Sequence, residues 1–342
     1  MLSTLSNTKV KLIGDPHLGK KFVEGVAPHR RGEREAEQME HFRRELNTPG
    51  VDMNVMMGDI FDAFLVSTDT LVQTFTAYLH AATALPNTLF VLLRGNHDVS
   101  RDMERYSSFD ILTEMLAQLP NVKVVDDVEI IEAFGSKEPF LFCGYSAFIS
   151  TKDRIREHEE FGVIPRGTSV VAAFGHWDAD SFGNDFNLVP IETLGDFTSL
   201  AFSGHVHTPY ERSYDRPNGT FQLVGTGSMQ PYTFAEDPHG DLYVTDTLEN
   251  VERNLEGNPE FYKDKCLRII LEPGRSAPAI ECRQLATKST GAGDNQEMEV
   301  RSEEFQFASV FRDHFGELGF NEQEISTLWN EYQGVERDVQ ES

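Results

Sequence analysis

Short apolar runs alternate with longer amphipathic stretches along the first 225 residues of the chain. Seven runs are rich in aliphatic and aromatic side chains, and most end at a glycine or a polar residue: 10–14, 51–57, 89–94, 140–144, 169–174, 200–203 and 221–224. Such runs predict buried strands. Between several of them, apolar residues recur at helical spacing over 33–46, 71–82 and 109–119. The alternation predicts an α/β layered fold.

Five polar motifs lie mostly just after these predicted strands. In chain order they are Asp15-Pro16-His17, Gly58-Asp59-Ile60-Phe61-Asp62, Gly95-Asn96-His97-Asp98, Gly175-His176 and Gly204-His205-Val206-His207. Because ligands of α/β proteins bind where the carboxyl ends of strands emerge, we expect the motifs to meet there. They offer seven oxygen or nitrogen donors, namely Asp15, His17, Asp59, Asn96, His176, His205 and His207. This donor set suits two adjacent divalent metals that share a carboxylate.

The ordered set resembles the calcineurin-like metallophosphoesterases, from about residue 9 to about residue 245. The resemblance implies two packed β-sheets flanked by helices, with the donors divided between two metal ions. The first ion is expected among Asp15, His17, Asp59 and His207, and the second among Asp59, Asn96, His176 and His205. Asp59 is the expected bridge. Mn²⁺ is the expected metal, with Mg²⁺, Fe and Zn²⁺ as alternatives.

His97 stands beside this donor set without being needed as a ligand. It is therefore the expected acid that protonates the leaving alkoxide. Asp62 is placed as in superfamily members whose carboxylate orients that histidine. Asp98 is expected to fix its loop through local hydrogen bonds. Arg94 and Arg101 flank the same motif and are the candidates for binding substrate phosphate.

Three local features bear on which phosphoesterase this is, and one of them is a helical hairpin predicted in the tail that resembles the element by which SbcD-type subunits bind an SbcC-like ATPase. Residues 15–19 carry the Leu-Gly extension seen in the SbcD family of DNA-repair nucleases, and residues 225–236 look like that family's G-S-x-x-P-x-x-F-x-E segment. Phosphoprotein phosphatases would instead show Arg-Gly after Asp62, where Ala63 and Phe64 stand. The resemblance thus implies a Mn²⁺-dependent DNA exonuclease, with single-strand endonuclease activity as an extension. A stand-alone phosphodiesterase or nucleotidase on small substrates and a non-catalytic binding scaffold are the alternatives.

The chain is expected to divide into four parts. A catalytic domain at 9–240 precedes a small β-rich appendage at 241–285, a linker at 286–299 and a helical hairpin at 300–335. The appendage is shorter than the DNA-capping domain of cellular SbcD relatives, so the chain looks more like the compact phage subunits. The hairpin is expected to bind the coiled coil of an SbcC-like ATPase or to pack on its own domain. Its candidate contact residues are Phe311, Phe315, Leu328 and Trp329.

Charge limits how the chain can hold DNA. The net charge of −26 counts against tight unaided binding, although residues 20–44 carry seven Lys/Arg against five Glu. A basic surface on the ATPase partner could supply what is missing. Trp177 is expected in the core, with stacking on a base as its alternative. Without a signal peptide or an apolar membrane span, a cytoplasmic location is expected, in the host if the chain is phage-encoded. Whether the chain forms a homodimer stays open.

Overall fold

The computed structural model describes residues 1–100, 105–180, 186–237 and 239–290. The chain separates into two compact units. The first comprises Met1–Ile269 and Pro278–Thr287, and the second comprises Ile270–Ala277 and Lys288–Ser342. Within the described residues, every helix is too short or too polar to cross a membrane.

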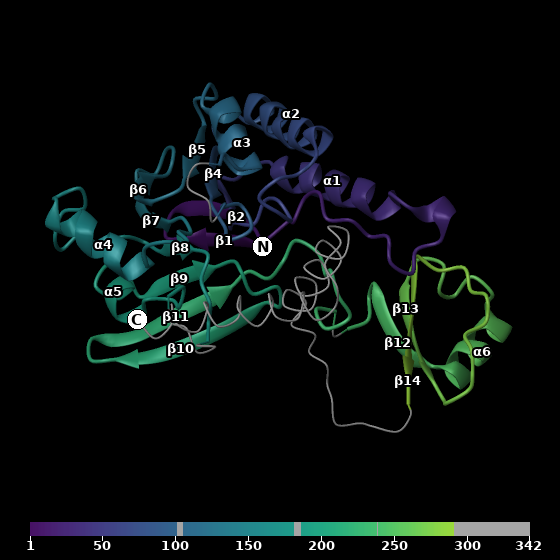
Figure 1. Ribbon diagram of the computed structural model, residues 1–342. Coiled ribbons are helices and arrows are strands. Elements are labelled where there is room, and N and C mark those ends of the chain that lie inside the picture. Colours follow the sequence, from purple (N-terminus) through teal and green to yellow (C-terminus); the bar gives the residue numbers. More distant parts are fainter. Residues whose placement is uncertain (101–104, 181–185, 238, 291–342) are drawn as a thin grey trace, which may run out of the picture. The chain divides into compact units, whose positions relative to one another are not determined.

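The first sheet is built from residues 2–125. Its five strands, in spatial order, are β1 (Leu2–Leu5), β2 (Thr8–Ile13), β3 (Met53–Met56), β4 (Leu89–Leu93) and β5 (Val122–Val125). Strands β2 to β5 are parallel, whereas β1 pairs antiparallel with β2. The parallel strands are connected through α1 (Glu33–Leu46), which follows the 3-10 turn at Pro28–Arg30, and through α2 (Thr68–Ala84) and α3 (Ser108–Leu116). Figure 1 shows these three helices on the same side of the sheet.

The second sheet is built from residues 128–225. In spatial order its strands are β10 (Tyr210–Arg216), β11 (Gly219–Gly225), β9 (Leu200–Ser203), β8 (Ala173–Gly175), β7 (Pro139–Cys143) and β6 (Val128–Glu132). The four inner strands are parallel, and the edge strands β6 and β10 run antiparallel to their neighbours. Helix α4 (Thr151–Glu160) lies between β7 and β8 in the chain, and helix α5 (Ile191–Leu194) lies between β8 and β9.

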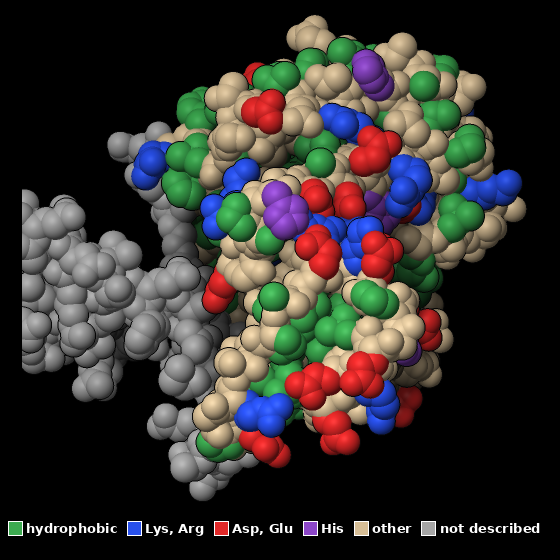
Figure 2. All heavy atoms as spheres, turned by 90° about the vertical axis from the view of Figure 1, so that its right-hand side faces the viewer, with side chains coloured by type: hydrophobic (Ala, Val, Ile, Leu, Met, Phe, Trp, Pro, Cys, Tyr) green, Lys and Arg blue, Asp and Glu red, His purple; other side chains and the backbone are tan. Residues whose placement is uncertain are grey.

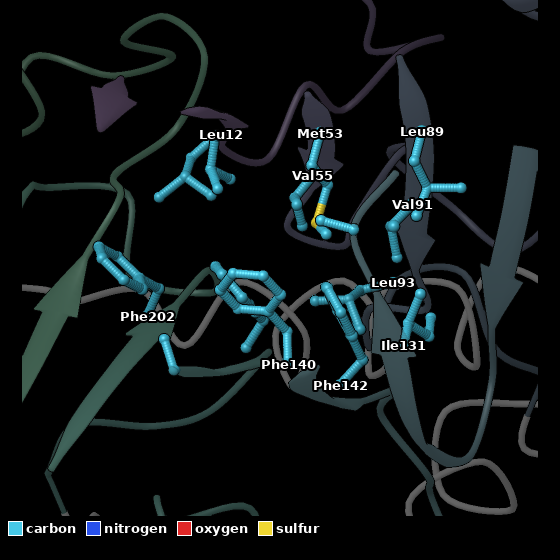
Figure 3. Close-up of a cluster of buried hydrophobic side chains, with 14 of the residues drawn as sticks. Leu12, Met53, Val55, Leu89, Val91, Leu93, Ile131, Phe140, Phe142 and Phe202 are labelled. Carbon is cyan, nitrogen blue, oxygen red and sulfur yellow. The ribbon is translucent and has the colours of Figure 1, made fainter. Parts of the chain in front are cut away.

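The two sheets pack face to face through a buried apolar core. Along β4, Leu89, Val91 and Leu93 enter this core, while the intervening Phe90 and Leu92 join the cluster under α1 to α3. This alternation follows from the two-residue period of a strand. Figure 3 shows side chains from both sheets meeting in this core: Leu12, Met53, Val55, Leu89, Val91 and Leu93 from the first, and Ile131, Phe140, Phe142 and Phe202 from the second. A third cluster covers the outer face of the second sheet. The predicted α/β fold with two packed sheets flanked by helices is confirmed.

The segment after the second sheet contains more helix than expected. It consists of β12 (Tyr243–Thr247), α6 (Leu248–Gly257), β13 (Cys266–Leu271) and β14 (Gln284–Ser289). The ten-residue helix α6 begins at Leu248 and is capped by Thr247, whose side chain accepts a hydrogen bond from the Asn250 N–H. Because β14 extends to Ser289, the prediction of a linker over 286–299 is wrong for its first four residues. The rest of that linker beyond residue 290 and the predicted hairpin at 300–335 lie outside the described residues.

Candidate metal centre

All seven predicted donors lie in loops that follow parallel strands. The loops after β2, β3, β4, β8 and β9 carry them. Six of them, together with His97, form overlapping groups in which the donor atoms all lie within 4.8 Å of one another: Asp15 with His17 and His207, His17 with Asp59 and His97, and Asp59 with His176 and His205. Asp59 therefore stands between the two groups predicted to hold separate metal ions.

The loops adopt backbone conformations that are uncommon for residues with side chains. His17, Asp59 and His205 have positive φ angles of 44°, 48° and 74°. Such residues persist only where the surrounding structure holds them, and they gather at functional sites. Glycine beside them permits close packing, since a Cβ on Gly58 would lie 2.4 Å from the Nδ1 atom of His176. The loops thus pack against one another too closely for a larger residue at this position.

Each imidazole of the second donor group, His176 and His205, is oriented by a contact of one of its two ring nitrogens. His176 Nδ1 lies 2.9 Å from the Met57 carbonyl oxygen and donates to it, and His205 Nε2 lies 2.8 Å from Asp178 Oδ1. These partners leave His176 Nε2 and His205 Nδ1 as the ring nitrogens that can bind a metal. The two nitrogens lie 2.8 and 2.9 Å from the Asn96 Oδ1 atom. Three atoms that offer lone pairs thus converge, an arrangement that a shared cation stabilises.

The first donor group has the same construction. His207 Nδ1 lies 3.2 Å from Glu236 Oε1, and His17 Nδ1 lies 3.4 Å from Asp62 Oδ1. The opposite ring nitrogens, His17 Nε2 and His207 Nε2, are 2.9 Å apart. The buried Oδ2 atom of Asp15 lies 3.9 Å from His207 Nε2. A buried carboxylate oxygen next to facing imidazoles fits a divalent cation.

The electrostatics of the site favour cations. Asp15 and Asp59 are only 0% and 2% exposed. Burial raises the pKa of Asp15, whereas for Asp59 the opposing effect of burial is outweighed by His176, His17 and His97 together, so its pKa is lowered. Burial alone would lower the pKa of His176, but Asp59 and Asp15 outweigh it and raise that pKa to about 10. The same negative potential that would hold a proton on His176 will attract a metal cation.

The match to a protein family agrees with this geometry. Residues 8–209, which include all seven donors, match the family model of the calcineurin-like phosphoesterases. The chain belongs to that family. It is therefore a metallophosphoesterase, and the donor set described above fits the divalent metals that the family uses. No curated protein matches the chain. Among solved structures it is similar to the Pseudomonas putida nuclease MPE, with 14% identity, a TM-score of 0.31 and coverage of 67% of this chain and 86% of that one.

His97 lies against Asp59, the predicted bridging carboxylate of this metallophosphoesterase. Its backbone N–H donates to Asp59 Oδ1 at 2.9 Å, and its Nδ1 lies 2.7 Å from the backbone carbonyl oxygen of Asp62. The carboxylate of Asp62 instead lies 3.2 Å from Lys20 Nζ and 3.4 Å from His17 Nδ1. The prediction that this carboxylate orients His97 is therefore wrong about the group, because the main chain of Asp62 makes the contact.

Asp98 joins the two loops that carry Asp59 and Asn96. Its carboxylate accepts hydrogen bonds from the N–H groups of Gly95, Ile60 and Phe61 at 2.9, 3.3 and 3.1 Å. The expectation that Asp98 fixes the loop through hydrogen bonds is confirmed. Its partners extend beyond its own loop, so it also holds the loop after β3 to the loop after β4.

The other predicted residues lie apart from the donors or outside the described residues. Arg94 donates to the carbonyl oxygens of Tyr145 and Asp126 at 3.0 and 2.7 Å, which ties together the segments after β4, β5 and β7. Its role in substrate binding stays a prediction, and Arg101 lies outside the described residues. Trp177 is 1% exposed, and its indole N–H donates to a threonine of α4, so the expected core position is confirmed.

Several residues that support the site were not predicted to do so. Tyr232 donates through its hydroxyl group to the Pro16 carbonyl oxygen at 2.5 Å, and Gln38 donates to the same oxygen at 2.7 Å. Asp178 and Glu236 orient imidazoles, as described above. Tyr232 and Glu236 belong to the 225–236 segment, so their motif was a usable signal. Asp178 has only its position two residues after a donor histidine, and Gln38 has no sequence signal.

Proposed function

We propose that this chain is a Mn²⁺-dependent DNA nuclease that acts as the SbcD-type subunit of a recombination or repair complex. The observation that carries the proposal is the buried Asp59, which stands between two imidazole-rich donor groups and also accepts a hydrogen bond from the backbone of His97. Family membership supports phosphoester hydrolysis. The choice of DNA rests on the two SbcD-like segments, residues 15–19 and 225–236.

The side chains divide the work of hydrolysis between them. When bound, two divalent ions would neutralise the phosphate ester and make the attacking water more acidic. His97 would protonate the leaving oxygen through Nε2, because its Nδ1 is bonded to the Asp62 carbonyl oxygen. The contact of its backbone N–H with Asp59 keeps the acid at a fixed distance from the shared carboxylate. The proposed proton donor His97 and the predicted metal ligands are therefore held in place by the same contact.

The second SbcD-like segment supports the first donor group. The Tyr232 hydroxyl donates to the carbonyl oxygens of Asp15 and Pro16 at 3.1 and 2.5 Å. Glu236 accepts from the Tyr232 N–H at 2.8 Å and pairs with His207 at 3.2 Å. This segment thus fixes the loop after β2 from one side and orients a donor imidazole from the other. Because Tyr232 and Glu236 contact the donor loops directly, we propose that the SbcD-like sequence of this segment serves the metal centre.

DNA binding is proposed to depend on a partner. On the face drawn in Figure 2, Lys/Arg and Asp/Glu side chains are interspersed among the described residues, and the whole chain carries a net charge of −26. Such a surface releases few counterions from DNA. We propose that an SbcC-like coiled-coil ATPase supplies the basic surface and binds residues 300–335, with Phe311, Phe315, Leu328 and Trp329 as anchors.

A stand-alone phosphodiesterase on small substrates is the second candidate, and the acidic charge is the observation that favours it. The two are separated by assaying the chelated and Mn²⁺-restored protein on a single-stranded oligonucleotide, on bis(p-nitrophenyl) phosphate and on cyclic nucleotides. The nuclease proposal predicts metal-restored cleavage of the oligonucleotide. Turnover of the small esters with intact DNA, both alone and with an SbcC-like ATPase, would overturn it. A non-catalytic scaffold would hydrolyse none of them.

A further inference from the structure

Lys20 lies at the outer edge of the metal centre. Its Nζ atom is 3.2 Å from Asp62 Oδ1, and the same oxygen lies 3.4 Å from His17 Nδ1. Because His17 Nε2 faces His207, Nδ1 is on the side of the ring that points away from the donors. The Lys20 and Asp62 side chains are 33% and 29% exposed. The ammonium group is therefore close to the site, reachable from solvent and not part of the donor set.

A tight turn fixes Lys20 in this place. The Lys20 N–H donates to the His17 carbonyl oxygen at 3.2 Å. Between them Gly19 has a φ of +95°, and a Cβ there would lie 2.9 Å from the Val66 side chain. Because the turn begins at a donor residue, the root of the lysine side chain cannot move far from the metal centre.

The ion pair of Lys20 with Asp62 can be exchanged at little cost. Ion pairs that water reaches contribute little to stability. A substrate phosphate offers the ammonium a charge-assisted hydrogen bond of equal or greater strength. Asp62 meanwhile keeps His17 as a neighbour and holds His97 through its main chain, so the general acid is not released. Lys20 can thus change partner without disturbing the site.

We propose that Lys20 binds the phosphate next to the scissile one, on the leaving-group side. Asp62 Oδ1 links Nζ to the outer nitrogen of His17 through distances of 3.2 and 3.4 Å, so we place Nζ next to, and not at, the scissile phosphate that ions at the donors would hold. The main chain of Asp62 contacts His97, the proposed acid for the leaving group. We therefore place Lys20, which contacts the Asp62 side chain, on the leaving-group side. This inference rests on the proposed function and deepens it. It makes Lys20 a positioning residue that favours substrates with at least two phosphates in series.

The test compares substrates with many phosphates and with one. In the Mn²⁺-loaded full chain, Lys20→Ala should lower kcat/KM for an oligonucleotide about tenfold, mainly through KM, and leave bis(p-nitrophenyl) phosphate turnover unchanged. Lys20→Arg should recover most of the loss. Lys21→Ala, which removes the adjacent exposed lysine, is the matched control and should behave as wild type on both substrates. The slope of log kcat/KM against log salt should be shallower by about 0.7 in Lys20→Ala, the value for one phosphate contact on a single strand.

The outcomes separate this inference from the function it rests on. If the wild type cuts the oligonucleotide and Lys20→Ala cuts it equally well, the inference alone is overturned. Equal losses on both substrates would also overturn it, because Lys20 would then act on the scissile phosphate or on the metal centre. If the wild type hydrolyses only the small ester, the proposed nuclease function fails and the inference fails with it.

Discussion

Replacing Asp98 by alanine should destabilise the protein and loosen its metal centre. Asp98 is completely buried, and its two carboxylate oxygens accept hydrogen bonds from the N–H groups of Gly95, Ile60 and Phe61. Alanine leaves three buried donors without a partner. Because these donors belong to the loops after β3 and β4, the loops that carry Asp59 and Asn96 lose their common anchor.

The size of the effect follows from those three donors. Each unsatisfied buried N–H costs about 1–3 kcal/mol. Burial raises the pKa of Asp98 to about 7, so part of this cost is offset when the ionised carboxylate is removed. We expect a net loss of roughly 3 kcal/mol or more, which corresponds to a fall in Tm of roughly 6–12 °C for a domain of this size. Asp98→Asn keeps one acceptor oxygen and should lose about half as much.

Thermal unfolding with excess chelator measures this without interference from metal release. Asp215→Ala, on the exposed side of edge strand β10, is the control and should stay within about 0.5 kcal/mol of wild type. Metal content after dialysis should fall in Asp98→Ala. A Tm for Asp98→Ala within about 2 °C of wild type would refute the reasoning, because three orphaned donors in a rigid loop pair would then cost almost nothing.

Three further predictions concern the donors and their supports. His97→Ala should keep the metals and lower turnover by about 10²–10⁴. The control His80→Ala, on the exposed side of α2, should leave turnover unchanged. Loss of a metal from His97→Ala would show that His97 is a ligand. Asp178→Asn should weaken metal binding about 10–100-fold in equilibrium dialysis, and unchanged affinity would remove its role in orienting His205. Because the pKa of His176 is raised to about 10 without metal, Mn²⁺ must displace a proton there. Calorimetry should show proton release and tighter binding as pH rises from about 7 to 8.5, and a pH-independent affinity would contradict this. The proton's contribution to stability in the metal-free protein is complete below the ordinary value of 6.5 and disappears as pH passes through about 10.

The core strands and the donor loops could be predicted because each leaves a local signal. The strand at 200–203 and the helix at 33–46 match β9 and α1 at both ends, since apolar runs and helical spacing follow directly from burial. The run at 169–174 was less informative. Val170 and Val171 donate to the carbonyl oxygens of Phe197 and Pro139 outside any strand ladder, so β8 begins only at Ala173.

Features that depend on distant contacts left no such signal. The edge strand β10 alternates half-buried with exposed polar residues, and its composition alone does not identify it as a strand. Gln38 supports the site through hydrogen bonds to the carbonyl oxygens of Pro16 and His17, across 22 and 21 residues of chain. For Asp62, sequence position identified the right neighbour of His97 but not the atom that makes the contact. Which atom points where depends on packing that spacing does not record.

The metal content of the wild type and of Asp59→Ala tests the central claim most directly. After loading with Mn²⁺ and removal of excess ion, elemental analysis should give two ions per wild-type chain. Asp59→Ala should lose metal at both sites, because this carboxylate stands between the two donor groups. Asp215→Ala, which removes an exposed carboxylate on edge strand β10, should retain both ions and serves as the control. A wild type with a single ion, or an Asp59→Ala variant with unchanged metal content, would contradict the two-ion account.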